Sequence, residues 1–311
     1  MKRVVSRSEL GGKRAPRAVL PRRRFAFRGA GFWAGLAGFG ALVSLAALLE
    51  PTDLAYAWGP KAHQLVDRSA VITLPPAVRP FFQASQSFIL DHADDPHQWM
   101  LKDPSQRTHH YIYLDKYGLF PYIQLPYSYK LAVGKYGGRR INSNGTLPWT
   151  VGEYSLRLTN DFQEQKWEVA KLDAAILAYY VAESHDPMNT TQNFDGQLTG
   201  QKGLSVRFGS SLVERYANFF MLHPEAAAKV DDPTNYAFQM AIEANTWVDR
   251  ILWADWRSRA GLSDYTDEYF DRFYTQIGST AMQEIDAATH DTGSYWYTAW
   301  LNAGQPALPT H

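Results

Sequence analysis

A tryptophan behind a cleavage signal, and a histidine five residues later, are the first residues that could do chemistry. The triplet Ala55-Tyr56-Ala57 has the small-x-small pattern of a signal-peptidase site, and cleavage there makes Trp58 the new N-terminus. A free α-amine has a pKa of about 7.7–8.0, so coordination to a metal can deprotonate it near neutral pH. Because His63 adds an imidazole nitrogen close by, the two residues predict a metal site.

Further nitrogen and carboxylate donors follow along the chain. His97 stands just after Asp94, His110 begins a His-Tyr-Ile motif, and Glu183 lies near the end of a helical pattern. A single histidine or carboxylate is more simply explained as a surface or core residue. Their order behind Trp58 is what predicts a shared site.

This order of motifs resembles the zinc-dependent phospholipase C and single-strand-specific nuclease superfamily, in particular its bacterial branch. Members are all-helical phosphoesterases with three zinc ions, one of which is bound by the mature N-terminal tryptophan. The resemblance runs from Trp58 to about Val213. The motifs that carry it are Trp58-Gly59 with His63, Asp103-Pro104 before His110-Tyr111-Ile112, residues 115–118 (DKYG), residues 144–149 (NGTLPW) and residues 194–201 (FDGQLTGQ).

The resemblance implies metal ligands at several positions. Trp58 and His63 match the N-terminal ligands, and His110 matches a histidine ligand. An aspartate ligand of the family falls at His97, which could bind zinc through nitrogen. Asp94 is the alternative if the loop is shifted.

Other positions of the family pattern are substituted. The helical His-x-x-x-Asp pair reads Tyr179 and Glu183, and tyrosine is a poor zinc ligand because its pKa is near 10. Glu183 keeps a carboxylate. The remaining substituted ligand positions are Asn189, Ser205 and Gly209, which together would remove one family zinc.

The sequence therefore predicts one zinc ion, or two at most, rather than three. The first would be held by Trp58, His63 and Glu183, and a second by His110 and His97. Catalysis would depend on Glu183 and His110. Two interpretations of His185 stay open, because it could add a nitrogen ligand or cap the end of its helix.

Two classes of function follow from the resemblance. One is a metal-dependent phosphoric ester hydrolase with a reduced site, acting on a phospholipid headgroup or a small nucleotide phosphodiester. The other is a catalytically inactive pseudoenzyme that serves as a binding or structural module. Loss of one charge-stabilising group costs on the order of 10³-fold in rate, so any activity is expected to be low.

Helical periodicity dominates the segments that must position these residues. Apolar residues recur at helical spacing in 163–183, 211–222, 236–259 and 264–288, and strand patterns are scarce. Within 236–259 the spacing predicts a core stripe of Trp247, Ile251, Leu252 and Trp256. We predict one all-α, multi-helix domain over residues 58–311, of the phospholipase C/nuclease type, with long loops.

Residues 1–57 have the composition of an export signal. They contain ten Lys and Arg residues and three Asp and Glu residues. Residues 58–311 contain 21 Lys and Arg residues and 28 Asp and Glu residues, which gives a net charge of −7. Residues 21–27 (PRRRFAF) resemble a twin-arginine signal, with an ordinary secretory leader as the alternative, so a periplasmic or secreted protein is predicted. The apolar run 29–49 could anchor the chain in a membrane if the leader is not cleaved. If the leader is cleaved, membrane contact would be transient.

The predicted mature chain, residues 58–311, is acidic, which disfavours long duplex nucleic acid as a partner. The chain has no cysteine, so it forms no disulfide bonds.

Overall fold

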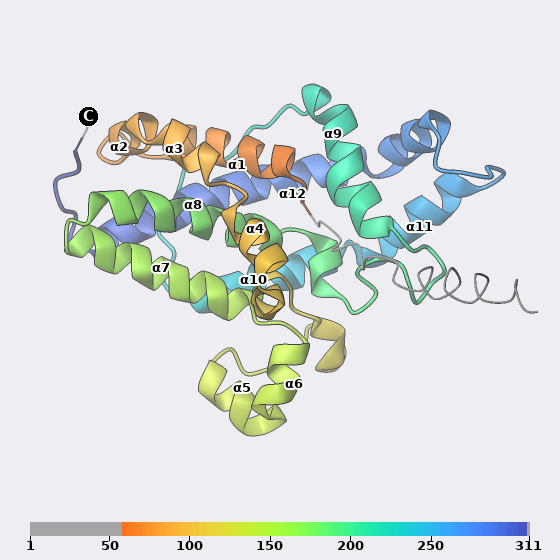
Figure 1. Ribbon diagram of the computed structural model, residues 1–311, viewed down its shortest axis with the longest axis horizontal. Coiled ribbons are helices and arrows are strands. Elements are labelled where there is room, and N and C mark those ends of the chain that lie inside the picture. The colour runs from red at the N-terminus through yellow and green to blue at the C-terminus, as the bar shows by residue number, and fades with distance from the viewer. Residues whose placement is uncertain (1–57, 310–311) are drawn as a thin grey trace, which may run out of the picture. The chain divides into compact units, whose positions relative to one another are not determined.

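A computed structural model describes residues 58–309, and every regular element in that range is helical (Figure 1). The predicted all-α class is confirmed. The predicted export signal, with its apolar run and cleavage site, falls on residues 1–57, outside the described residues. The elements are α1 (Pro60–Thr73), α2 (Arg79–Ala84), α3 (Gln86–Asp91), α4 (Asp95–Lys102), η2 (Pro104–His110), η3 (Leu114–Lys116), α5 (Tyr129–Tyr136), α6 (Gly138–Ser143), α7 (Leu147–Gln163), α8 (Trp167–Ser184), η4 (Pro187–Thr190), η5 (Val206–Leu212), α9 (Val213–Tyr216), η6 (Ala217–Phe219), α10 (Pro233–Asn245), α11 (Val248–Arg259) and α12 (Asp267–Asn302).

The helix that carries Tyr179 and Glu183 lies at the centre of the fold. α8 packs against α1, α3, α7, α10 and α12, so its residues are buried almost without interruption from Asp173 to Ser184. A helix that is apolar on all sides belongs in a core. From helical spacing, only one broad apolar face was expected for residues 163–183. The helix is buried on its other sides as well, because small residues such as Ala174 and Ala178 let neighbouring helices approach there.

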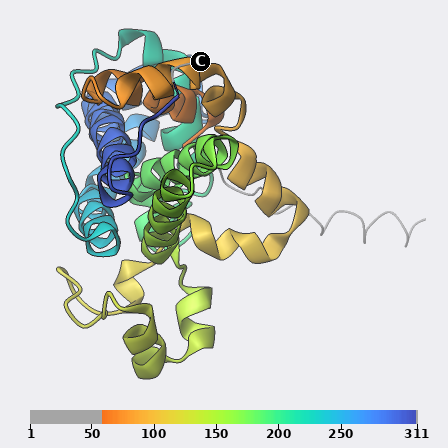
Figure 2. The ribbon, with the colours of Figure 1, turned by 90° about the vertical axis from the view of Figure 1, so that its left-hand side faces the viewer.

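The longest helix runs alongside α8. α12 has 36 residues and is about 54 Å long, and it packs against α1, α7, α8 and α11 (Figures 1 and 2). Thr266 begins it, with a side chain that accepts a hydrogen bond from the Tyr269 backbone. Neither α12 nor any other helix in the described part of the chain is both long and apolar enough to cross a bilayer.

Two of the predicted helical segments are divided in the structure. Residues 211–222 fall on η5, α9 and η6, and residues 236–259 form the two helices α10 and α11. The predicted core stripe is correct for Ile251, which is fully buried, and wrong for Trp256, which is 62% exposed. The buried face of α11 instead consists of Val248, Ile251, Ala254, Asp255 and Ser258, which leaves Trp256 in solvent.

Residues 116–143 form a lobe that contains α5 and α6. Both views show these helices projecting below α7 and α10 (Figures 1 and 2). Its small core joins Tyr117, Tyr122, Leu125 and Ile141 to Phe238 of α10. Residues 116–143 therefore have helices and a small core of their own.

Candidate metal centre

Five of the residues singled out from the sequence come from four separate parts of the fold and meet beside α8. His63 lies in the first turn of α1, whose start is fixed by Pro60 at its first position. His110 ends η2, and Asn189 lies in η4 directly after α8. Tyr179 and Glu183 are one turn apart on α8 and therefore lie on the same face.

The closest approach in this group joins His63 to Glu183. His63 Nε2 lies 3.2 Å from Glu183 Oε1, and both side chains are almost fully buried. Neither atom has a hydrogen-bond partner of acceptable geometry within residues 58–309. Two ligands of one tetrahedral zinc ion, each bonded at about 2.0–2.2 Å, lie about 3.3 Å apart. The pair is thus spaced as two donors to a common cation would be.

The second carboxylate oxygen of Glu183 is held by the protein. Asn189 Nδ2 donates to Glu183 Oε2 at 3.0 Å and to the Glu183 backbone carbonyl at 3.1 Å. Asn189 stands at a substituted ligand position, and here it orients Glu183 by hydrogen bonds. Such bonds fix the direction in which a carboxylate presents its free oxygen.

Tyr179 fills the space between two histidines. Its ring stacks on His63 with centroids 4.2 Å apart, and its hydroxyl lies 3.1 Å from His110 Nδ1. A tyrosine hydroxyl is a poor zinc ligand at neutral pH but a good hydrogen-bond partner for imidazole. Tyr179 is therefore a packing residue that contacts both rings.

The backbone of Trp58 borders the same pair. The indole is buried and packs on Phe208 with ring centroids 5.5 Å apart. The Trp58 backbone lies close to both side chains, since it acts on the pKa of Glu183 and on that of His63. A free α-amine at Trp58 would therefore stand next to both side chains.

Gly59 explains how Trp58 is held in place. The Gly59 N–H donates to the Gly209 carbonyl at 3.3 Å, and a Cβ on Gly59 would lie 2.9 Å from Ser210 Oγ. The absence of a side chain lets the N-terminal segment approach η5 closely. Gly209, another substituted ligand position, serves here through its backbone.

Burial controls the protonation of the donors. It raises the pKa of Glu183 to about 8, against the hydrogen bonds from Asn189 and the Trp58 backbone. It lowers the pKa of His63 to about 4, and that of His110 to about 3 with help from His97. Both imidazoles are therefore neutral at pH 7, which is the form that binds a metal.

Both alternatives for the family's aspartate ligand lie near this group. The charge of Asp94 acts on His63, His97 and Glu183. Burial lowers the pKa of His97, and Asp94 opposes that change. Asp94 also accepts a hydrogen bond from Gln98 at 2.7 Å. The choice between His97 and Asp94 stays open.

The described side chains do not provide a complete set of ligands for a metal ion. In residues 58–309, no three or more His, Cys, Asp or Glu side chains are arranged to hold a metal ion. The second ion expected on His97 and His110 therefore lacks a ligand group in the described chain, because Tyr179 stands where a donor would be needed. His63 and Glu183 supply two side-chain donors, to which only the amine of a processed Trp58 would add a third.

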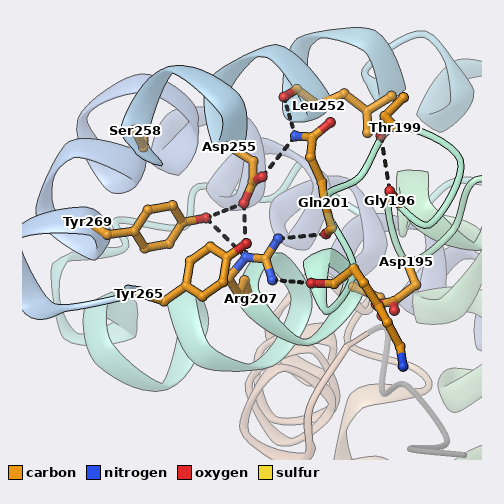
Figure 3. Close-up of polar contacts among 12 residues, drawn as sticks. Asp195, Gly196, Thr199, Gln201, Arg207, Leu252, Asp255, Ser258, Tyr265 and Tyr269 are labelled. Atoms are coloured by element: carbon orange, nitrogen blue, oxygen red, sulfur yellow. Dashed lines mark hydrogen bonds and ion pairs between the residues drawn. The ribbon is translucent and has the colours of Figure 1, made fainter. Parts of the chain in front are cut away.

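The segment with the two remaining substituted positions is anchored by a buried arginine (Figure 3). Arg207 pairs with Asp255 at 2.9 Å, donates to the carbonyls of Gln201 and Lys202, and lies over the ring of Tyr265. Ser205, two residues before it, donates to Asp195 at 3.0 Å. Ser205 thus stabilises the preceding loop and contributes no donor to the centre.

His185 is the C-cap of α8, where its backbone N–H donates to the Ala182 carbonyl, and both of its ring nitrogens face buried carboxylates on α12. Nε2 lies 2.9 Å from Asp291, and Nδ1 lies 3.5 Å from Glu284. Burial alone would lower the pKa of His185, but the two carboxylates raise it to about 9. His185 is therefore a charged residue that fixes the end of α8 to α12.

We expect His185→Gln to lower the free energy of unfolding by about 1.5 kcal/mol, because a hydrogen bond to a charged partner is lost. Urea denaturation at pH 6.5 in the presence of a chelator measures this. His223→Gln, at an exposed position, is the control and should leave stability unchanged. Equal stability of the two variants would contradict the role of His185.

The sequence analysis missed two buried acids near this centre. Asp67 lies one turn after His63 on α1, and Asp186 follows His185. Burial raises the pKa of both well above the usual range. Extending the i, i+4 spacing from His63 would have pointed to Asp67.

An open groove of about 940 Å³ lies beside η2. His109 lines it together with Thr108, Trp149 and Glu153, whereas the neighbouring His110 is buried at the centre. None of the residues that line it is Lys or Arg. The groove suits an uncharged portion of a ligand better than a phosphate.

Comparisons with known proteins give distant likenesses among solved structures alone. No protein-family model matches this chain, and no curated protein does. Among solved structures, an alpha toxin from Clostridium absonum matches with 13% sequence identity and a TM-score of 0.49, over 80% of this chain and 65% of the toxin chain. This chain thus spans less than two thirds of the toxin's length.

Proposed function

We propose that this chain is an exported phosphoric ester hydrolase-type protein whose reduced site holds one zinc ion. The single observation that carries the proposal is the buried pair His63 Nε2 and Glu183 Oε1, 3.2 Å apart and without a proper hydrogen bond in the described chain. Unpaired buried donors that face each other are costly unless a ligand or cation joins them.

The residues that would hold the ion are His63, Glu183 and the processed amine of Trp58. A bound zinc ion would supply Lewis-acid polarisation of a phosphoryl oxygen. Asn189 keeps Glu183 oriented, and the Tyr179 hydroxyl fixes His110 so that its neutral ring presents Nε2. His110 Nε2 is buried without a hydrogen-bond partner in residues 58–309, so it is available to hydrogen-bond a bound substrate or water.

The substrate class that we propose is a small phosphodiester or a phospholipid headgroup. The motifs shared with the phospholipase C and nuclease superfamily support the class, and the net charge of −7 over residues 58–311 argues against long duplex nucleic acid. Export, by the twin-arginine or the general route, and the division at residues 57/58 are part of the same proposal and depend on the sequence of the first 57 residues.

The alternative function is a pseudoenzyme that binds without turnover. The observation that favours it is the lack of a complete side-chain ligand group in the described residues. Asn189, Ser205 and Gly209 are all engaged in bonds within the protein, so none is free to restore a lost ion.

Metal content and turnover separate the two functions. Protein that begins at Trp58 is expected to contain about one zinc per chain and to hydrolyse bis(p-nitrophenyl) phosphate slowly, in a reaction that EDTA stops. Glu183→Gln should lose both metal and turnover, and Glu214→Gln, at an exposed position, should keep both. Metal without turnover would support the pseudoenzyme, and neither metal nor turnover would reject the proposed centre.

A further inference from the structure

The lobe formed by residues 116–143 differs in charge from the rest of the chain. It contains five basic residues and no Asp or Glu, whereas residues 58–311 as a whole carry 21 basic and 28 acidic residues. All five basic side chains are exposed, and none forms an ion pair within residues 58–309. They are Lys116, Lys130, Lys135, Arg139 and Arg140.

The same lobe exposes large apolar side chains. Leu119 is 89% exposed, Ile123 84%, Leu131 63% and Phe120 59%. Scattered apolar residues are normal on a surface, but three of these lie within five consecutive positions of one loop. Together they form an apolar tip.

The apolar tip is not a part of the lobe's own core. Tyr122 and Leu125 of the same loop point inward and are buried against Tyr117, Ile141 and Phe238. The Tyr122 hydroxyl donates to Asn245 of α10, which fixes the loop to the main body. The core is therefore complete without Leu119, Phe120 and Ile123, and their exposure is a fixed feature of this loop.

Two of the basic residues, Lys135 and Arg140, contact the loop that carries the apolar tip. Lys135 Nζ and the Tyr136 hydroxyl both donate to the carbonyl of Gln124, which directly follows Ile123. Arg140 donates to the carbonyl of Lys116 at 2.7 Å. These contacts hold α5 and α6 against the two ends of the loop that carries the apolar side chains.

From this juxtaposition we propose that the lobe is a docking surface for an anionic lipid bilayer. Leu119, Phe120 and Ile123 enter the interfacial region, and the cations around them meet anionic headgroups. Pairing with the same lobe of a second copy is disfavoured because it would bring the same positive charges together. A nucleic acid would satisfy the cations but leave the aliphatic side chains without a partner. The proposal does not depend on the metal centre.

Co-sedimentation with vesicles tests the docking surface on protein that begins at Trp58. We expect binding to phosphatidylcholine vesicles with 30% phosphatidylglycerol, and at least about tenfold weaker binding to pure phosphatidylcholine or in 0.5 M salt. Leu119→Ser with Ile123→Ser should weaken binding at least about tenfold, and Lys116→Gln with Lys130→Gln and Arg139→Gln should do the same. Trp253→Ser with Trp256→Ser, on the exposed face of α11, is the control and should bind normally.

A fluorescent label gives an independent measurement, because the chain has no cysteine of its own. An environment-sensitive dye on Ile123→Cys should shift to shorter wavelength with anionic vesicles, and the same dye on Ile72→Cys of α1, also an exposed apolar position, should not. Equal shifts at both positions would overturn the proposal. So would absence of vesicle binding, loss of binding only in the α11 variant, binding of heparin without vesicles, or a dimer that buries the lobe.

Discussion

A chain that begins one residue early, at Ala57, is expected to bind zinc about 100-fold more weakly than a chain that begins at Trp58. Structural zinc sites with four ligands contribute roughly 10–16 kcal/mol, or about 3 kcal/mol per ligand, which corresponds to about 100-fold in affinity. An extra residue converts the Trp58 amine into a peptide N–H, which cannot donate a lone pair. Competition with a chromophoric zinc chelator measures both affinities.

This comparison is sharp because the two chains differ only where the Trp58 backbone meets Glu183 and His63. Equal thermal unfolding of the two metal-free proteins would show that the fold is unaffected. Adding Glu183→Gln to each chain should remove zinc binding from both. Equal zinc affinity of the two unsubstituted chains would reject the α-amine as a ligand and leave His63 and Glu183 without their third donor.

Asp67→Asn is expected to change how stability depends on pH. Asp67 is buried and neither carboxylate oxygen has a hydrogen-bond partner within residues 58–309. Because burial raises the pKa of Asp67 well above the unfolded value of 3.8, the folded chain keeps a proton that the unfolded chain releases. The contribution of Asp67 is therefore fully present below pH 3.8 and is lost as pH rises, by about 1.4 kcal/mol per unit until the folded pKa is reached.

The measured quantity is the free energy of unfolding of the metal-free wild type minus that of Asp67→Asn. We expect this difference to fall by at least about 2 kcal/mol between pH 4 and pH 7. Urea denaturation at several pH values in EDTA provides it. Asp91→Asn, at an exposed position of α3, should give a nearly constant difference. Parallel stability curves for the wild type and Asp67→Asn would show that Asp67 is ionised in the folded protein.

The metal centre and the docking lobe suggest different tasks for two parts of the chain. The centre is buried beside α8, whereas residues 116–143 project from the main body (Figure 2). The two proposals fail independently, since vesicle binding needs no zinc and zinc binding needs no vesicle. If both hold, the lobe would bring a lipid-hydrolysing or lipid-sensing site to a membrane surface.

The sequence by itself determined the fold class. Helical periodicity is a local property, so the all-α class and the buried helix with Glu183 could be inferred from spacing. Trp58, His63, His110 and Glu183 were predicted as ligands from the order of motifs and the family that this order resembles. Local patterns could not decide that 236–259 breaks at Thr246 or that Trp256 faces solvent, since both depend on how α11 packs against α12.

Only the tertiary structure decided what the substituted positions do. Asn189 looked like a missing ligand, but it orients Glu183; Tyr179 fills the space between His63 and His110. His185 pairs with Asp291, which lies 106 residues away. The exposed apolar tip around Ile123 could not be predicted from the sequence either, because an apolar residue in a loop can lie in the core or on the surface. Contacts between distant segments settle such questions, and neither spacing nor composition contains them.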